Sequence, residues 1–158
     1  NTGGTFNKVY NELNGKLEIP SNNLAIEKIV NTSFRGNLNI TIKGIIYKDS
    51  LDMTDEDRDL IIKEVKGFDK VIIIHGTDTM DVTANYLSKF VFDKTVVLTG
   101  AMKPFSIEPI EATSNLTASL TFLQNCHISD IFIGMHGLVE KHQNIEKNRT
   151  IGKFELSN

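Results

Sequence analysis

Three short segments of this chain combine glycine with side chains that can take part in chemistry. They are Thr2-Gly3-Gly4-Thr5, His75-Gly76-Thr77-Asp78-Thr79 and Gly100-Ala101-Met102-Lys103-Pro104. Glycine allows a tight turn and lets a ligand approach the backbone closely, so the flanking hydroxyls face whatever binds there. A threonine hydroxyl becomes a nucleophile only when another group takes its proton, and amide cleavage also needs an oxyanion site. The three segments contain threonine hydroxyls together with side chains that could exchange protons with them.

Each segment taken alone also has an ordinary structural interpretation. The first could be a phosphate-binding turn, but it lacks the G-x-G-x-x-G spacing and the acidic residue about 20 positions later that dinucleotide binding requires. Thr77 and Asp78 could simply cap the helix that follows them. His75 is more often a structural histidine than a base. Ser50, in a fourth polar segment, could be a turn or cap residue.

Strands and helices that alternate along the chain must position these segments. Short β-branched runs predict strands, and apolar residues at helical spacing predict helices. A continuous aliphatic run between two helices indicates a strand buried on both faces of a parallel sheet. The expected strands are 38–47, 71–74, 95–99 and 131–135, and the expected helices are 23–31, 54–67, 81–90 and 110–123.

This alternation predicts a single α/β domain with a doubly wound, mostly parallel sheet flanked by helices, Rossmann-like or flavodoxin-like. We expect Val71–Ile74 and Thr95–Thr99 to be the central, fully buried strands. Residues 8–20 are polar and predict a mobile loop, and the charged residues after Lys141 predict a tail of weak periodicity. In such a sheet, ligands bind at the carboxyl ends of the strands, where the glycine-containing segments lie.

Composition excludes several classes of function. The chain has 158 residues, 17 basic and 20 acidic, for a net charge of -3, which argues against nucleic acid or an anionic membrane as the main partner. No apolar run approaches the roughly 20 residues of a membrane span. The single cysteine, Cys126, excludes an internal disulfide framework. His127, His136 and His142 show no metal-ligand spacing with one another or with it, so we expect no metal site.

The chain opens at Asn1, without methionine and directly on a turn motif. We therefore expect that the first strand of the sheet is truncated upstream of Asn1, and that a signal peptide could have been lost with it. The cysteine content fits a reducing compartment, so the expected location is cytoplasmic.

Together the segments are far more specific than any one of them. The sequence resembles the bacterial-type L-asparaginase family of threonine-nucleophile amidohydrolases, through Thr2–Thr5 and His75–Met80 in the right order, reinforced by Asp49–Met53 and Gly100–Pro104. The resemblance covers residues 1–158 as the family's N-terminal domain, with no counterpart of its smaller C-terminal domain. It implies hydrolysis of L-asparagine or a similar small amide to the acid and ammonia, without a cofactor, by a homo-oligomer.

The resemblance also implies roles for individual residues. Thr5 matches the nucleophile, and Tyr10 resembles the tyrosine that assists it. Thr77 and Asp78 match a second threonine and its acidic neighbour, which work with a lysine. Lys147, 147 − 77 = 70 positions after Thr77, is the candidate for that lysine. The implied substrate-binding positions are Ser50, for the α-carboxylate, with Leu51, Gly76, Thr77, Asp78 and Ala101.

The sequence also departs from the family pattern. Leu51 stands where many members carry glutamine, and this chain does not supply the acidic residue of the C-terminal domain that helps to bind the substrate's α-amino group. Two alternatives therefore accompany the amidohydrolase hypothesis. One is a non-catalytic domain that binds a small amino acid or a partner subunit, and the other is an asparaginase-like subunit of a tRNA-dependent amidotransferase. The preferred amide and the oligomeric state are left open.

Overall fold

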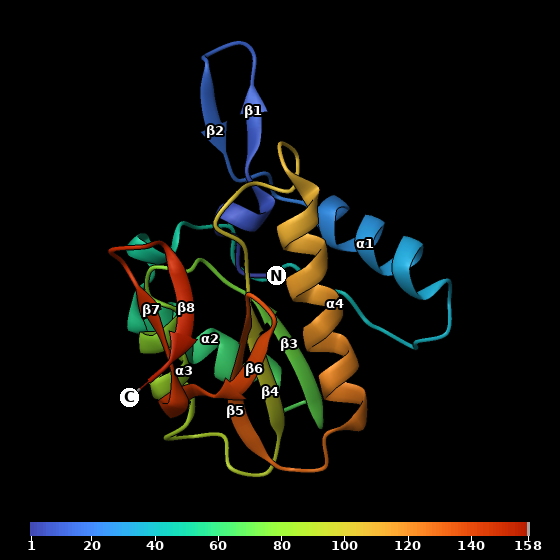
Figure 1. Ribbon diagram of the computed structural model, residues 1–158, viewed down its shortest axis with the longest axis vertical. Helices are drawn as coiled ribbons and strands as arrows, with labels where there is room; N and C mark the ends of the chain where they lie inside the picture. Colours follow the sequence, from blue (N-terminus) through green and yellow to red (C-terminus); the bar gives the residue numbers. More distant parts are fainter. Residues whose placement is uncertain (158) are drawn as a thin grey trace.

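A four-stranded sheet forms the centre of the computed structural model, which describes residues 1–157 (Figure 1). Its strand order is β3-β4-β5-β6. The first three strands are parallel, and β6 is antiparallel to β5. The bounds are Lys70–Ile74 for β3, Thr95–Thr99 for β4, Asp130–Met135 for β5 and Leu138–Lys141 for β6.

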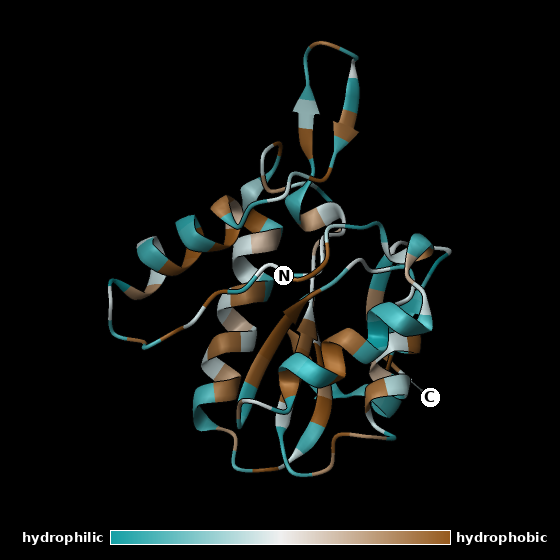
Figure 2. Ribbon diagram, turned by 180° about the vertical axis from the view of Figure 1, so that it is seen from behind, coloured by the Kyte–Doolittle hydropathy of each residue, from teal (hydrophilic) through white to brown (hydrophobic). Residues whose placement is uncertain are grey.

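Helices cover both faces of this sheet, as alternation along the strands requires. Ile73, Val96 and Leu98 point to the face covered by α2 (Asp55–Val65) and α3 (Met80–Leu87). The other face packs against α4 (Pro109–Asn125), on which α1 (Leu24–Phe34) lies. Figure 2 shows the strands mainly in the hydrophobic colour, between helices that turn polar residues outward. The predicted α/β class with a mostly parallel sheet is confirmed.

Helix α2 illustrates how local sequence sets an element. Thr54 and Asp57 form a capping box, in which each side chain accepts a hydrogen bond from the other's backbone N–H. Asp55 and Glu56 add negative charge to the first turn, where the helix dipole favours it. The predicted start at Thr54 is therefore confirmed.

Strand β3 differs from its predicted place in the sheet. The aliphatic run Val71–Ile74 was expected to be central, but β3 pairs with β4 alone and forms an edge, with Val71 and Ile72 only half-buried. On its outer side, among residues 1–157, the strand backbone meets only Thr2, whose N–H donates to the Ile74 carbonyl at 3.0 Å. The prediction was correct for Thr95–Thr99, all of whose residues are buried.

The predicted strand 38–47 is also wrong. This segment belongs to no strand, because it reaches too few partner residues for a hydrogen-bonded ladder. Its last part meets the start of the chain, where Ile45 N–H donates to the Asn1 carbonyl at 3.0 Å. Lys48 forms an isolated parallel bridge with Gly3. The segment therefore runs beside the sheet rather than within it.

Two hairpins replace segments that were predicted to be irregular. Residues 8–20 contain β1 (Val9–Asn11) and β2 (Lys16–Glu18), which form the projection at the top of Figure 1. The Asn14-Gly15 pair turns this hairpin, with Gly15 at φ 70°. The charged end of the chain forms β7 (Ile145–Asn148) and β8 (Lys153–Leu156). Short 3-10 turns η1, η2 and η3 span Thr5–Asn7, Ser50–Asp52 and His142–Asn144.

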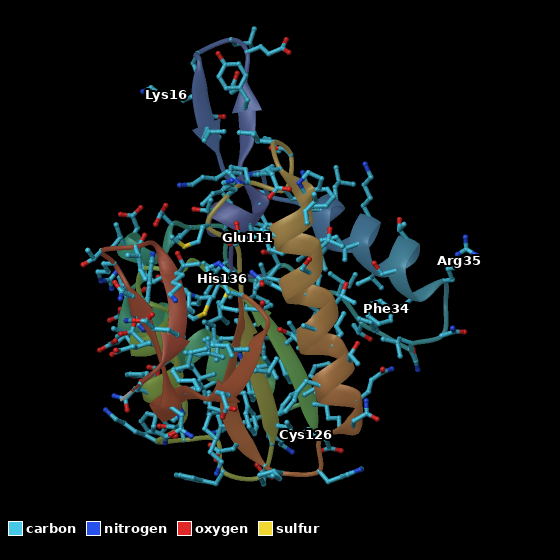
Figure 3. The ribbon with its side chains drawn as sticks, in the orientation of Figure 1. Lys16, Phe34, Arg35, Glu111, Cys126 and His136 are labelled. Atoms are coloured by element: carbon cyan, nitrogen blue, oxygen red, sulfur yellow. The ribbon has the colours of Figure 1, made fainter. Side chains whose placement is uncertain are left out.

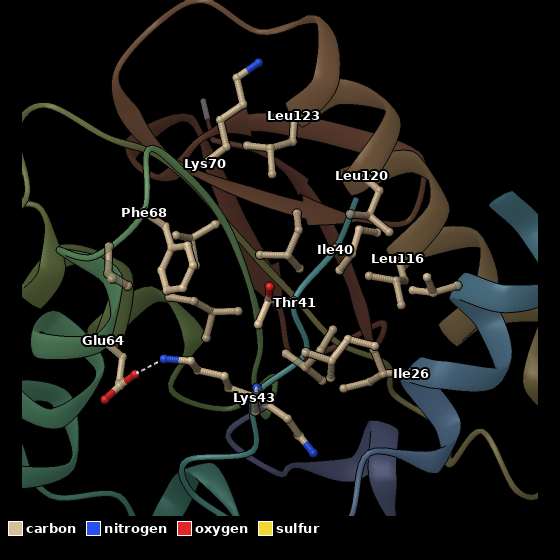
Figure 4. Close-up of a pocket in the computed structure, with 18 of the residues that line it drawn as sticks. Ile26, Ile40, Thr41, Lys43, Glu64, Phe68, Lys70, Leu116, Leu120 and Leu123 are labelled. Carbon is tan, nitrogen blue, oxygen red and sulfur yellow. Dashed lines mark hydrogen bonds and ion pairs between the residues drawn. The ribbon is translucent and has the colours of Figure 1, made fainter. Parts of the chain in front are cut away.

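A large apolar cavity lies along the free edge of β3 (Figure 4). Its volume is about 610 Å³, and side chains of β3, α1, α4 and residues 38–43 line it. Lys43 and Glu64 form an ion pair at its rim, with 3.0 Å between Nζ and Oε2. None of the side chains implicated in catalysis lines this cavity. It is therefore separate from the candidate active site.

Candidate active site

The first two glycine-containing segments meet through direct backbone contact. Gly4 lies at φ 75°, and its N–H donates to the Lys48 carbonyl at 2.9 Å. A Cβ on Gly4 would stand 2.5 Å from the Gly76 nitrogen, so the turn tolerates no side chain there. Because these two glycines touch, the residues that follow them, Thr5 and Thr77, come from the same small region of the molecule.

Lys147 turns inward to the second of these threonines. Its ammonium donates to Thr77 Oγ1 at 2.9 Å and to Asp78 Oδ1 at 2.8 Å. The lysine side chain is only 10% exposed, although it comes from a charged segment. Strand β7 carries it there, opposite Phe154 of β8. The structure thus turns the candidate lysine inward, while its chemical role stays a prediction.

The hydroxyl of Thr77 has a defined direction. Since Lys147 donates to Thr77 Oγ1, the hydroxyl proton points elsewhere, and the acceptor is the sulfur of Met102 at 3.3 Å. Sulfur is a weak acceptor, so this proton is easily redirected to a stronger one. The ion pair from Lys147 Nζ to Asp78 Oδ1 at 2.8 Å holds the lysine head group beside this hydroxyl. The geometry of the group therefore suits relaying a proton and orienting a polar molecule.

Arg149 joins this group and was missed by the sequence analysis. Its guanidinium donates to the Asp78 carbonyl at 2.8 Å and to Asp78 Oδ1 at 3.3 Å. Two cations therefore share one carboxylate oxygen, although the arginine side chain is 59% exposed. Arg149 lies in the turn directly after β7, two residues beyond Lys147, and no pattern in the sequence marks it as part of the site.

Ser50 lies directly behind Gly76. Its side chain is buried, and its hydroxyl has no hydrogen-bond partner among residues 1–157. A Cβ on Gly76 would stand 2.6 Å from Ser50 Oγ, so the two are in close contact. The Ser50 carbonyl accepts from the Thr79 hydroxyl at 2.8 Å, which ties turn η2 to the start of α3. Leu51, by contrast, is 70% exposed and does not share this packing.

His75 is buried beneath the site. Its Nδ1 donates to the Gly76 carbonyl at 2.7 Å, and its Nε2 has no partner in the described part of the chain. Burial lowers the pKa of the imidazole to about 4, so the ring is neutral at pH 7. Its position favours the structural interpretation over that of a base.

The third segment completes the surroundings of Thr77. Ala101 is fully buried, and the next two backbone N–H groups are held by one carboxylate. Met102 N–H donates to Glu111 Oε1 at 2.8 Å, and Lys103 N–H donates to Glu111 Oε2 at 3.2 Å. The loop that brings the methionine sulfur to Thr77 is thereby fixed to the first turn of α4.

Tyr10 belongs to the projecting β1–β2 hairpin. It lies on β1, is 58% exposed, and its hydroxyl is beside Gly15 at the turn of the hairpin. Thr5 itself is half-buried at the start of η1. The structure thus assembles Thr5, Ser50, Gly76, Thr77, Asp78, Ala101 and Lys147 in one region, and leaves Tyr10 on the projecting hairpin.

Comparison with known proteins identifies the family. The model of the N-terminal asparaginase domain matches residues 1–153. The chain belongs to the asparaginase family. None of the helices described for residues 1–157 is long and apolar enough to cross a membrane.

The relatives in this family include proteins named as L-asparaginases and proteins named as amidotransferase subunits. An L-asparaginase of Thermococcus kodakarensis is 29% identical over 127 residues, which cover 77% of this chain and 38% of the relative. L-asparaginase 1 of Escherichia coli K12 is 35% identical over 89 residues, 52% of this chain and 26% of the relative. A glutamyl-tRNA(Gln) amidotransferase subunit of Methanosphaera stadtmanae is 40% identical over 106 residues, 63% of this chain and 24% of the relative.

The fold agrees with that of solved family members. The thermostable L-asparaginase from Thermococcus kodakarensis superposes with a TM-score of 0.84 and 27% identity, over 98% of this chain and 49% of that chain. This chain thus spans about half the length of that solved relative. It matches less than half the length of each of the three curated relatives.

Proposed function

We propose that this site hydrolyses the side-chain amide of asparagine, or of a similar small amide, and releases ammonia. The observation that carries the proposal is the Lys147 ammonium, which donates to both Thr77 and Asp78 from 70 and 69 positions away. If Thr77 and Asp78 only capped α3, they would not need an inward-turned lysine that donates to both of them.

The proposed reaction takes place in two steps. Thr5 Oγ1 forms a bond to the amide carbon, the C–N bond breaks, and the hydroxyl proton ends on the leaving nitrogen as ammonia. Water then adds to the ester, Thr5 Oγ1 leaves and regains a proton, and the free acid is released. Thr77 and Lys147 pass the protons in both steps. Backbone N–H groups at the opening of α3 stabilise the oxyanion.

Substrate recognition is proposed to use the charges around the two threonines. Ser50 Oγ, buried beside Gly76 and without a partner among residues 1–157, would donate to the α-carboxylate of the substrate. Asp78 has Oδ1 bonded to two cations, so its second oxygen would accept from the α-ammonium.

A second candidate function has its own support. Two of the relatives are named as glutamyl-tRNA(Gln) amidotransferase subunits, so an ammonia-supplying subunit of such an enzyme is the alternative. In that case a protein partner would receive the ammonia, and glutamine would be the preferred amide.

Ammonia release from asparagine and from glutamine by the purified chain tests the proposal. The chain should release ammonia from at least one of them, with asparagine preferred. Thr5→Ala should lower the rate at least about 100-fold, as expected for loss of a nucleophile. Thr121→Ala, at an exposed position of α4, is the matched control and should leave the rate unchanged. Ligand binding without ammonia release would instead indicate the non-catalytic domain.

A further inference from the structure

His136 occupies a constrained position between β5 and β6. Its backbone is left-handed, with φ 52°, which is uncommon for a residue other than glycine. The His136 N–H donates at 2.9 Å to Oδ1 of Asn115, a buried residue of α4. The same Asn115 side chain donates to the Gly100 carbonyl at 3.0 Å. These bonds fix the place of the ring against the glycine that ends β4.

The two ring nitrogens of His136 face different parts of the chain. The Phe154 N–H donates to Nδ1 at 3.0 Å, so Nδ1 carries no proton and the proton is on Nε2. Nε2 then donates to Glu111 Oε1 at 3.0 Å. Figure 3 shows the Glu111 and His136 side chains near each other, between α4 and the β7–β8 hairpin. The ring also packs edge-on against the Phe154 ring, with 6.0 Å between centroids.

Each of these two partners leads to a residue that contacts the Thr77 hydroxyl. Glu111 accepts from the backbone N–H groups of Met102 and Lys103, and the Met102 sulfur accepts from the Thr77 hydroxyl. Phe154 is the direct cross-strand partner of Lys147 in the β7–β8 hairpin. One imidazole therefore connects the loop beside Thr77 to the strand that carries the lysine.

We propose that His136 is a positioning residue that couples the 100–104 loop to Lys147. Its contacts are independent of any reaction, whereas its kinetic consequence rests on the proposed function. The loop carries Ala101, a proposed substrate contact, so the Glu111 side of the ring governs substrate affinity. The Phe154 side governs the place of the lysine ammonium and hence the chemical step.

Two conservative variants separate the two sides. In His136→Asn the amide oxygen takes the place of Nδ1 and still accepts from Phe154, but nothing reaches Glu111. In His136→Gln the amide nitrogen takes the place of Nε2 and still donates to Glu111, but the bond from Phe154 is lost. His127→Gln, at an exposed histidine, is the matched control.

Steady-state ammonia release should split between the variants. Loss of one hydrogen bond corresponds to a change of about five- to tenfold, so His136→Asn should raise KM by about that factor with kcat nearly unchanged. His136→Gln should lower kcat by a similar factor with KM nearly unchanged. His127→Gln should match the parent chain. The proposal is overturned if both variants match the parent, or if both change the same parameter equally.

An NMR measurement tests the coupling without reference to activity. The Met102 methyl signal should shift in His136→Asn and stay in place in His136→Gln. The Lys147 amide signal should do the reverse. If the parent chain releases no ammonia, the proposed function fails, and these two signals still decide the coupling. If neither signal moves in either variant, His136 does not couple the two sides.

Discussion

The Lys147 ammonium lies 2.8 Å from Asp78 Oδ1, although 69 positions separate the two residues along the chain. The lysine comes from the β7–β8 hairpin and the aspartate from the turn before α3, so neither is placed by its local sequence. At 10% exposure the lysine side chain has exchanged most of its water for these protein contacts. Charge-assisted hydrogen bonds of this kind are among the stronger ones in proteins.

Replacing Lys147 with methionine keeps the apolar stem and removes the ammonium. The relay between Thr77 and Asp78 is then lost, and we expect ammonia release to fall at least about 100-fold, as for loss of a proton-transfer group. Lys153→Met, at a half-exposed lysine of β8, is the control and should keep the parent rate. Wild-type kinetics in Lys147→Met would remove this lysine from the mechanism.

Arg149→Gln should change affinity more than rate. Without the guanidinium, Asp78 Oδ1 keeps only its bond to Lys147, so the carboxylate attracts a substrate ammonium more strongly. We expect KM for asparagine to fall about threefold at low salt, and this difference to shrink as salt screens the exposed arginine. Measurements of KM across a salt series check it. An increase in KM would mean that the arginine itself binds the substrate.

Ser50→Ala should separate stability from binding. The buried hydroxyl has no partner within residues 1–157, so its removal should raise the free energy of unfolding by about 1 kcal/mol. If the hydroxyl holds the substrate's α-carboxylate, the same change should raise KM about tenfold at similar kcat. Denaturant unfolding and steady-state kinetics measure the two effects. A less stable variant would show that the hydroxyl is paired in the folded protein.

His75 makes folding depend on pH. Its pKa is about 4 in the folded chain, below the ordinary value of 6.5, because burial disfavours the charged ring. Between pH 6.5 and 4 the unfolded chain takes up a proton on His75 and the folded chain does not. The contribution of His75 to the free energy of unfolding is therefore fully present above pH 6.5 and is lost as the pH falls toward 4. The loss amounts to about 3 kcal/mol.

Urea unfolding at several pH values between about 4 and 7 checks this dependence. His75→Gln should flatten the curve in that range, while His127→Gln, at an exposed histidine, should leave it as in the parent chain. An equally steep curve in His75→Gln would assign the effect to other groups.

Local patterns in the sequence were sufficient for the elements with strong signals. The capping box at Thr54 and the aliphatic run Thr95–Thr99 could be predicted without tertiary information. Residues adjacent in the sequence are enough to predict a helix cap or a buried strand. The same kind of run at Val71–Ile74 was misplaced, since apolarity predicts burial but not which strand ends the sheet. The short hairpins were missed because strands of three or four residues are too short to show a clear alternation of apolar and polar side chains.

The candidate site could be proposed only where residues resemble family motifs. Thr5, Thr77 and Asp78 lie in such segments, and Lys147 was the candidate because the resemblance places a lysine at a similar separation from Thr77. The links from Phe154 to His136 and from Arg149 to Asp78 join residues 18 and 71 positions apart, with no pattern at either end. Such contacts follow from the packing of the β7–β8 hairpin on the rest of the fold.

The position of β3 at the end of the sheet also has a consequence for the chain at high concentration. Beyond the bond from Thr2 to Ile74, the outer backbone groups of this strand lie beside an apolar cavity of about 610 Å³. An uncovered strand edge next to apolar surface acts as a template for any extended polypeptide that reaches it. Lys43 and Lys70 lie at the cavity lining, where charge opposes such pairing. Association of the concentrated chain through this edge would have to overcome these charges, and it would take place well away from the side chains proposed to cleave the amide.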